Sequence, residues 1–543
     1  MHILQLLKGS PVPDLKRIGV ITGLAGLANA VLIALVNISA EHAAAPHPLS
    51  VRLVLLFLIA FAIYFMTSRA SLLEANSLMQ ERLGQLRLRV TDKVRRAELR
   101  TLERLERGEI DATLAQEINH LSKDVPLLVS AAQSLVLLVF CLLYIAALSK
   151  ISFIVVTAAT LAALGVFWLR RESLNRRFRT LHAREAEMLD GLRGFTDGFQ
   201  EIRLNADKND RLYAHFTEVV ERLEAENVGA GGQRVVLLMF SNAFLYGLLG
   251  IVVLVLPAFF DGHTAIIYKI AAAAMFCVGP VAAVASAGHL LTRAEAGLSH
   301  VRRLEQRLDD GLAPDAEPAL PSRFHGFQTI AFEGARFSYR DARGEVTFTT
   351  GPWNLTLRRG ELVYLVGGNG AGKSTTMKLL SGLYAMDEGR LLVDGVPVDD
   401  GSRQEYRELF SAIFADFHLF DRLHGLDGVD PAVVRALIAR MELSGKVDFV
   451  DGRFSTLALS TGQRKRLAMI ASLLEAREIY LFDEWAADQD THFRDVFYTE
   501  ILPQLKREGR TVVVVTHDDR YWHLCDRRVV MDLGGLTAGQ AAV

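Results

Sequence analysis

Long apolar stretches recur through the first half of the chain and constrain its fold more than any other feature. A membrane-spanning helix needs about 20 apolar residues, because the hydrocarbon core of a bilayer is about 30 Å thick. The stretch from Pro126 to Leu169 is too long for one span, so we expect it to turn back near Ser149 and Lys150. We predict three helical hairpins, with spans at about residues 18–39, 51–68, 126–148, 151–169, 235–256 and 270–291.

Composition agrees with a membrane protein. Hydrophobic residues make up 50% of the chain and the mean hydropathy is +0.22, more than a soluble domain needs. The net charge is −2, so no positive field favours a nucleic-acid partner. The three cysteines, Cys141, Cys277 and Cys525, lie far apart without a CxxC pair, which indicates neither a disulfide framework nor a thiolate metal site.

Basic residues indicate how the spans are oriented. Arginines gather in residues 69–124 and 170–234, whereas the opposite loops contain only Lys150 and Lys269. Cationic segments resist translocation, so we expect both termini to be cytoplasmic. The two basic segments are about 55 and 65 residues long, enough for helices that extend tens of ångströms into the cytosol. A cleaved signal peptide is the alternative for the first span, but its apolar run exceeds the usual h-region and its loss would leave an odd number of spans.

A change of composition separates the membrane half from a second domain. Residues 308–324, LDDGLAPDAEPALPSRF, contain three prolines and several acidic residues that break the helical pattern. We therefore predict a transmembrane domain at 1–308, a linker at 309–325 and a soluble domain at 326–543. Roughly 220 residues is an ordinary size for one α/β domain.

A glycine-rich loop opens the chemistry of the second domain. The apolar run Leu362–Val366 is typical of a strand, and GGNGAGKS (Gly367–Ser374) leads from it into a predicted helix that begins at Thr375. Strand, P-loop and helix form a phosphate cradle, in which backbone N–H groups point at anionic oxygens. Lys373 is expected to reach the β- and γ-phosphates and the Ser374 hydroxyl to ligate Mg²⁺. The cradle residues are predicted to be Gly367, Asn369, Gly370, Gly372, Lys373, Ser374 and Thr375.

Two further apolar strands end in residues suited to phosphate chemistry. The run IYLFDE ends in Asp483 and Glu484, and VVVVTH ends in His517. In a parallel sheet these ends meet at one edge, beside the P-loop. We expect Asp483 to hold Mg²⁺, Glu484 to polarise the attacking water as general base, and His517 to contact the γ-phosphate and orient Glu484.

A second anion-binding turn precedes these strands. The sequence LSTGQRKRL places Ser460, Gly462 and Gln463 at the start of an apparent helix. Small polar residues and Gly at a helix N-terminus again favour an anion. One domain does not need two cradles for one nucleotide, so we expect the second to serve a nucleotide held by another copy of the chain.

These motifs occur in the order and spacing of an ATP-binding cassette (ABC) domain, and six spans followed by one cassette resemble an ABC half-exporter over nearly the whole chain. The resemblance implies that Tyr339, in ARFSY, stacks on adenine. It implies that Ser460, Gly462 and Gln463 grasp the γ-phosphate bound to the opposite subunit, and that Asp490 is the D-loop aspartate. A core tyrosine in an antiparallel strand is the alternative for Tyr339.

Two departures from the ABC pattern narrow the resemblance. Most ABC domains have Gln in the loop where this chain has FADFHLFD (414–421), and Ala415 cannot ligate Mg²⁺. If the loop shifts by one residue, Asp416 supplies the oxygen ligand that Gln normally gives. Alternatively, Asp416 caps a turn or pairs with a basic residue. We favour this alternative because a carboxylate beside the γ-phosphate adds electrostatic repulsion. Pro-Thr, usual after Glu484, is replaced in WAADQD. FADFHLFD, LSTGQRKRLA and DEWAADQD are similar to exporters of cyclic peptides and peptide siderophores, such as pyoverdine and syringomycin.

The cytoplasmic stretch 194–205, GFTDGFQEIRLN, is similar to the same branch, although an ordinary amphipathic helix explains it equally well. The predicted fold class is an α-helical membrane domain of six transmembrane helices with long cytoplasmic extensions, like a type I ABC exporter, followed by an α/β P-loop ABC domain. The resemblance implies ATP and Mg²⁺ as cofactors and a homodimer among the lipids of the bacterial inner membrane.

The implied function is ATP-driven export of a small cyclic peptide or peptide siderophore. Lipids or other amphipathic small molecules are alternative cargo. A membrane-tethered, ATP-gated regulator or channel is the alternative function, and the missing glutamine is its best support. No carboxylate lies in the middle of a span, which argues against a dedicated cation pump.

Overall fold

The computed structural model describes residues 12–44, 51–105, 110–111, 113–114, 118–255, 267–312, 322–341, 343–426 and 428–538. Contacts divide the chain into two compact units, one of Met1–Lys93 with Leu105–Arg307 and the other of Val94–Arg104 with Leu308–Val543. Much of the predicted linker, residues 313–321, lies outside the described residues, as do residues 45–50 and 256–266.

The first unit is built from long helices. Among the described residues these are α2 (Val12–Ala44), α3 (Val51–Arg96), α6 (Ile118–Leu148), α7 (Lys150–Asp197), α9 (Ala206–Gly250) and α11 (Ile267–Asp309). In the described residues, four helices are long and apolar enough to cross a membrane: Lys16–Ser39, Val51–Arg96, Ile118–Leu148 and Lys269–Asp309. Shorter apolar stretches lie at Lys150–Val166 and at Tyr246–Val255, where η2 (Ile251–Val255) continues α9. The first unit thus has the long apolar helices of a multi-pass membrane protein.

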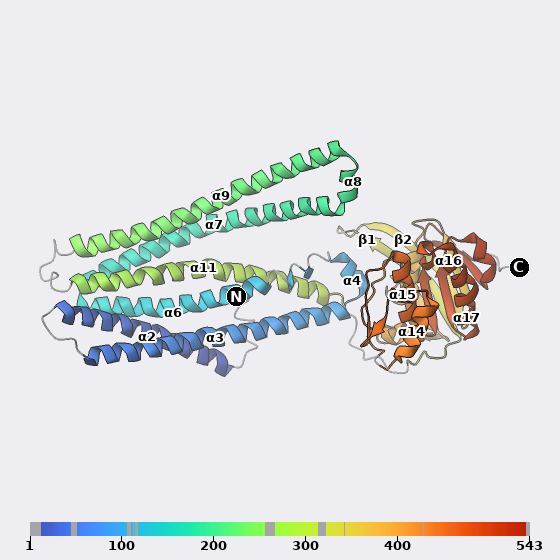
Figure 1. Ribbon diagram of the computed structural model, residues 1–543, viewed down its shortest axis with the longest axis horizontal. Helices are drawn as coiled ribbons and strands as arrows, with labels where there is room; N and C mark the ends of the chain where they lie inside the picture. The colour runs from blue at the N-terminus through green and yellow to red at the C-terminus, as the bar shows by residue number, and fades with distance from the viewer. Residues whose placement is uncertain are drawn as a thin grey trace. The chain divides into compact units, whose positions relative to one another are not determined.

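Ser149 ends the turn expected near Lys150: its hydroxyl accepts a hydrogen bond from the N–H of Ser152 and caps α7. Further along, α7 and α9 run side by side as a hairpin with α8 (Phe199–Arg203) at its tip (Figure 1). The tip contains the stretch 194–205, in which Gly198 ends α7 and the Asn205 side chain caps α9. The stretch is therefore a corner between helices rather than one amphipathic helix.

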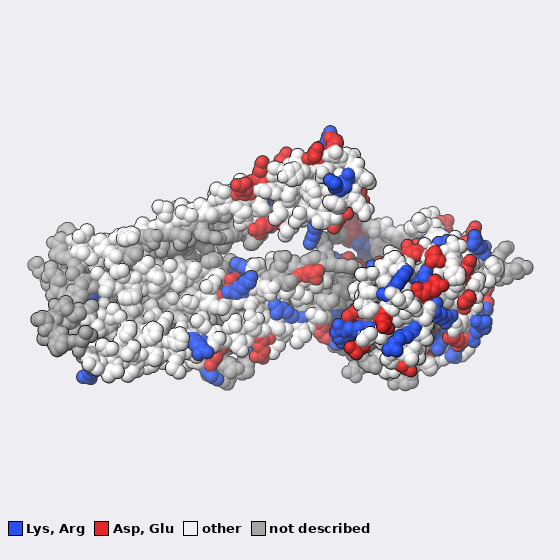
Figure 2. Space-filling model, viewed as in Figure 1, with Lys and Arg blue, Asp and Glu red and all other residues white. Residues whose placement is uncertain are grey.

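Apolar side chains fill the interior of the membrane unit, in a cluster that includes Leu138 and Cys141 of α6 and Cys277 of α11. Polar residues in the spans bond to one another: Thr22 and Ser71 are 2.7 Å apart, as expected for packing residues in lipid. Large apolar residues of α3 are exposed, among them Phe61 and Phe65. Much of the visible surface of these helices is free of charged groups, whereas charges of both signs cover the second unit (Figure 2).

Two sheets form the core of the second unit. A four-stranded sheet has the order β2-β1-β4-β5, from β1 (Thr329–Arg340), β2 (Val346–Arg358), β4 (Glu388–Val393) and β5 (Val396–Pro397). A six-stranded sheet has the order β12-β11-β3-β10-β9-β6, from β3 (Leu362–Gly367), β6 (Phe410–Ile413), β9 (Ile479–Asp483), β10 (Thr511–Val515), β11 (Arg527–Asp532) and β12 (Gly535–Ala538). The hairpin β7 (Phe449–Val450) and β8 (Arg453–Phe454) stands apart from both.

Register decides which side chains meet. Strand β10 pairs in parallel with β3 and β9, and Val515 lies opposite both Leu365 and Asp483. The three strands are buried along their length, which suits their runs of Val, Leu and Ile. Their carboxyl ends therefore reach one edge together.

Helices complete the second unit. They are α4 (Leu99–Arg104), α12 (Lys373–Leu380), α13 (Arg403–Arg407), α14 (Pro431–Arg440), α15 (Thr461–Glu475), α16 (Thr491–Val496) and α17 (Leu502–Arg507), with the short turns η3 (Trp485–Asp488), η4 (Phe497–Ile501) and η5 (Asp519–Leu524).

Candidate nucleotide-binding site

The P-loop joins β3 to α12 as the sequence predicts, and its glycines are required by close backbone contacts. A Cβ on Gly367 would lie 2.2 Å from the carbonyl oxygen of Met531. Gly372 has a φ of 101° and precedes α12 without any side-chain cap. The first N–H groups of α12 are thus available to an anion.

Lys373 is buried, and its ammonium donates to the carbonyl oxygens of Gly367 and Gly368, each at 3.0 Å. The ammonium also lies 4.0 Å from the Glu484 carboxylate. The side chain therefore curls back over the loop that it serves, between the phosphate cradle and the proposed general base.

A cavity of about 540 Å³ opens above the P-loop. Its lining residues are Tyr339, Phe348, Asn369, Gly370, Gly372, Lys373, Ser374, Thr375 and Glu484. Tyr339 lies on β1, and its hydroxyl is 3.3 Å from Thr375 Oγ1 and 3.1 Å from the Tyr384 hydroxyl. The structure thus places it in an antiparallel strand and at the cavity wall at once, so the two readings of Tyr339 are compatible.

Asp483 ends β9 with its side chain almost fully buried. Burial raises the pKa of this carboxyl, Glu484 adds to the rise, and Ser374, Lys373 and the Ala415 N–H oppose it. Within the described residues its Oδ1 has no hydrogen-bond partner. A buried carboxylate oxygen without a partner, next to a serine hydroxyl, fits a Mg²⁺ site.

Glu484 follows Asp483 in a left-handed conformation, with φ of 50°. His517, just after β10, places Nε2 3.2 Å from Glu484 Oε1. The sheet register therefore brings together the two residues predicted from separate strand ends.

The residues of the second anion-binding turn, Ser460, Gly462 and Gln463 (the signature residues), do not lie at this cavity. Ser460 caps α15: its hydroxyl accepts from the Gln463 N–H, and the Gln463 side chain accepts from the Ser460 N–H. Gly462 packs so closely against η3 that a Cβ would lie 2.5 Å from the Asp488 carbonyl oxygen. Of the described residues that line the cavity, none comes from this motif.

Asp490, the predicted D-loop aspartate, caps α16 by accepting from the Phe493 N–H at 2.8 Å and pairs with Arg466. The Phe493 hydrogen bond and the Arg466 charge lower the pKa of Asp490. This residue supports the loop after β9 and is not among the described residues that line the cavity.

The loop after β6 shows where the missing glutamine matters. The Ala415 N–H helps to lower the pKa of the Asp483 carboxyl, so the main chain at this position lies near the proposed metal site. Asp416 is exposed and acts electrostatically on Lys378 of α12. Burial would lower the pKa of Lys378, but Glu103, with Tyr339 and Asp416, outweighs burial and raises it.

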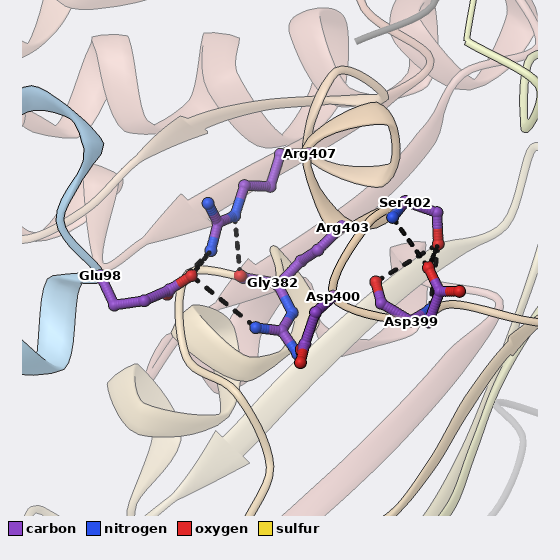
Figure 3. A network of polar contacts seen from close by, with 7 residues as sticks. All are labelled: Glu98, Gly382, Asp399, Asp400, Ser402, Arg403 and Arg407. Atoms are coloured by element: carbon purple, nitrogen blue, oxygen red, sulfur yellow. Dashed lines mark hydrogen bonds and ion pairs between the residues drawn. The ribbon is translucent and has the colours of Figure 1, made fainter. Parts of the chain in front are cut away.

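Residues 94–104, which interrupt the membrane helices in sequence, belong to the second unit. Glu98 accepts from Arg407 of α13 at 3.0 Å and lies 3.7 Å from Arg403, beside the Arg407 contact with the Gly382 carbonyl (Figure 3). Glu103 pairs with Lys378 at 2.8 Å and contacts the Tyr384 hydroxyl. Through Tyr384 this segment reaches Tyr339 at the cavity wall.

Sequence reasoning missed two residues at or beside the site, Phe348 and Lys465. Phe348 lines the cavity from β2, where only an alternating apolar pattern marks it. Lys465 reaches the backbone of Glu484 from α15. A lysine inside a predicted helix is normally solvent-exposed, so the sequence contained no signal for this contact.

Comparisons with known proteins agree with this geometry. Residues 351–487 match the family described as ABC transporter. The chain is 42% identical over 267 residues to the ATP-binding protein SyrD of Pseudomonas syringae pv. syringae, covering 47% of each chain. It is 28% identical over 279 residues to the ATP-dependent lipid A-core flippase of Hahella chejuensis, covering 48% of this chain and 45% of that one. The matches thus span about half the length of these relatives.

One solved structure matches a larger part of the chain than these relatives do. A bacterial Atm1-family ABC exporter with ATP bound superposes with a TM-score of 0.73 over 97% of this chain and 96% of that one, at 18% identity. At that identity the likeness shows the fold alone. These findings support the resemblance indicated by the sequence: residues 351–487 match the ABC transporter family, the chain as a whole has the fold of the Atm1-family exporter, and the predicted fold class is confirmed.

Proposed function

We propose that this protein is a homodimeric exporter that hydrolyses ATP to move a peptide-derived compound, a cyclic peptide or peptide siderophore, across the bacterial inner membrane, with both termini in the cytoplasm. The observation that supports ATP-driven work most directly is the shared sheet edge, where Lys373, Ser374, Asp483, Glu484 and His517 meet beside one cavity.

Each residue has a role in this proposal. Lys373 and the N-terminus of α12 bind the β- and γ-phosphates, and Tyr339 stacks on adenine beside Phe348. Ser374 and Asp483 hold Mg²⁺, which when bound neutralises phosphate charge. Glu484 takes a proton from the attacking water, and His517 holds the Glu484 carboxylate in place.

The signature residues support the homodimer. Ser460, Gly462 and Gln463 lie outside the set of described residues that line the cavity, yet they form a helix N-terminus suited to phosphate. A second copy of the chain supplies the nucleotide that they contact. The signature and the P-loop then form each site together.

The cargo class rests on two similarities: the motifs FADFHLFD and DEWAADQD, and the 42% identity to SyrD. An amphipathic lipid is the alternative cargo, because the chain is also 28% identical to the lipid A-core flippase. Inverted membrane vesicles, in which the cytoplasmic face is outside, distinguish the two when ATP is added to the external medium. We expect ATP-dependent uptake of a cyclic lipopeptide or a peptide siderophore that exceeds the movement of a labelled lipid.

Glu484→Gln is the matched control for transport. It should abolish uptake and multiple-turnover hydrolysis while ATP stays bound, because an amide cannot accept the proton. Undiminished hydrolysis in this variant would contradict the assignment of the general base.

A regulator or channel gated by ATP binding is the second candidate, and Ala415 favours it because its methyl side chain cannot ligate Mg²⁺ where most ABC domains have Gln. Proteoliposomes that show ionic conductance without ATP-dependent accumulation of cargo would support this function over export.

A further inference from the structure

A buried lysine connects the signature helix to the proposed general base. Lys465, on α15, is only 3% exposed. An ammonium removed from water costs free energy unless charged and polar partners surround it, so a buried lysine marks a place where its contacts matter. No function assigned above uses this side chain.

Lys465 is held at both ends. Its Nζ donates to the Glu484 carbonyl oxygen at 2.8 Å and lies 2.7 Å from Asp488 Oδ2. Its own carbonyl accepts from the Trp485 indole N–H at 3.0 Å. Trp485 is fully buried and stacks on Phe497 with ring centroids 4.6 Å apart, so the anchor is rigid.

The backbone of Glu484, to which Lys465 donates, is in an unfavourable conformation. Glu484 adopts a φ of 50°, a region that a residue with a Cβ occupies at a cost. The Glu484 N–H donates to the Val515 carbonyl, and the Ala487 N–H reaches the Glu484 carbonyl at 3.3 Å. Lys465 adds the shorter, charge-assisted bond to that carbonyl and thereby fixes the orientation of the peptide after Glu484.

We propose that Lys465 is a positioning residue for ATP hydrolysis, which holds the Glu484 backbone so that its carboxylate stays beside His517 and the cavity. The proposal rests on the proposed role of Glu484 as general base. Displacing a catalytic group by about 1 Å costs on the order of 100-fold in rate, so a lost backbone anchor is felt in turnover rather than in ATP binding.

The anchor also joins two parts of the site. Lys465 lies five residues after Ser460, on the helix that this residue caps, while Glu484 serves the P-loop of the same chain. A movement of α15 is therefore passed directly to the general base through the Lys465 ammonium.

Lys465→Met tests this role, because methionine keeps much of the length of the side chain and removes the ammonium. In the full-length protein we expect kcat for ATP to fall about 30-fold and KM to change less than about threefold. Lys506→Met is the matched control: it removes a lysine that pairs with Asp526 on the surface of the same domain, and should alter kcat less than about twofold.

The decisive readout is the same substitution in a Glu484→Gln background, measured by single-turnover hydrolysis of labelled ATP. If Lys465 acts through Glu484, the double variant is no slower than Glu484→Gln alone, within about twofold. A further loss comparable to that in the parent, or a Lys465→Met protein as active as the Lys506→Met control, would overturn the proposal.

Trp485→Phe decides the matter if Lys465→Met does not fold. It removes the indole N–H that holds the Lys465 carbonyl and keeps an aromatic ring against Phe497. We expect a loss in kcat of about 3- to 10-fold that disappears in the Glu484→Gln background, and a loss that persists there would contradict the role. Full turnover by Glu484→Gln alone is a separate result, which overturns the base assignment and with it the positioning role.

Discussion

Two helices of the ATP-binding domain begin with small residues, but their N-termini are built differently. α12 follows Gly372 without a side-chain cap and faces the cavity with Lys373 and Ser374. α15 begins with a closed capping box between Ser460 and Gln463, on exposed surface. The uncapped start of α12 leaves its first N–H groups open to an anion in the adjoining cavity, whereas the capping box of α15 already satisfies part of its N-terminus and lies away from that cavity.

Lys373→Ala should break the α12 site most severely. Removing a buried, hydrogen-bonded cation from a phosphate partner costs about 2 to 5 kcal/mol, so we expect ATP affinity to fall by at least about 30-fold and hydrolysis to vanish. Fluorescence titration with a labelled ATP analogue measures the affinity. Binding within threefold of the parent would contradict the P-loop role of Lys373.

Ser460→Arg should distinguish the role of the α15 N-terminus from that of the α12 N-terminus. The affinity of the detergent-solubilised variant for ATP should stay within about threefold of the parent's, because Ser460 is not among the described residues that line the cavity. Turnover should fall about 100-fold or more, because hydrogen-bond donors to the γ-phosphate bound by the other chain are lost. Titration and steady-state ATPase are measured on one preparation. A parallel loss of both would show that the α15 start serves the nucleotide of its own chain.

The effect of Asp483→Asn on protein stability tests whether the site beside α12 is built to hold a metal ion. Burial raises the pKa of Asp483 in the folded protein above its value in the unfolded chain, which is about 4. The ionised carboxylate therefore destabilises the folded state once the pH exceeds the folded pKa. Below the unfolded pKa the group is protonated in both states, and this destabilisation is absent. At pH 7 and without Mg²⁺, the variant should be more stable by on the order of 1 kcal/mol, yet inactive. Thermal unfolding with and without Mg²⁺ tests this; a lower Tm without Mg²⁺ would contradict it.

Asp416→Ala and Ala415→Gln should have the smallest effects. If Asp416 helps only to transmit hydrolysis to transport, ATPase should change less than about threefold in Asp416→Ala while transport falls further. If it ligates Mg²⁺, ATPase should fall in Asp416→Ala and rise in Ala415→Gln. Both rates are measured in the same vesicles, so the two outcomes exclude each other. The exposed position of Asp416 and its effect on Lys378 favour the first.

Much of the site was predictable because its signals are local. GGNGAGKS between a strand and a helix specifies a phosphate cradle by itself, and the apolar runs before Asp483 and His517 place their ends at one edge of a parallel sheet. The long apolar helices of the first unit were predictable for the same reason, since length and polarity decide them within one segment; four of the described helices are long and apolar enough to cross a membrane.

Contacts between distant segments were not predictable. Glu98 meets Arg403 and Arg407 across more than 300 positions, and charged residues at helix ends give no hint of a partner so far away. Lys465 is buried because Trp485 and Asp488 surround it, although its helical position alone suggests an exposed face. The corner at 194–205 depended on how Gly198 and Asn205 end and cap helices, which composition left open.

The central claim is that the α12 start of one chain and the α15 start of another form one site. ATPase of purified heterodimers tests it, with Lys373→Ala in one chain and Ser460→Arg in the other. Both lesions then fall on one shared site and the second site is intact, so we expect partial ATPase to return above either homodimer of single variants.

The matched control places both substitutions in one chain and pairs it with the unaltered chain, which damages both shared sites. The account predicts activity in the first heterodimer and little in the second. The reverse result, activity only when both lesions share a chain, would show that each site is built within one chain and would contradict it.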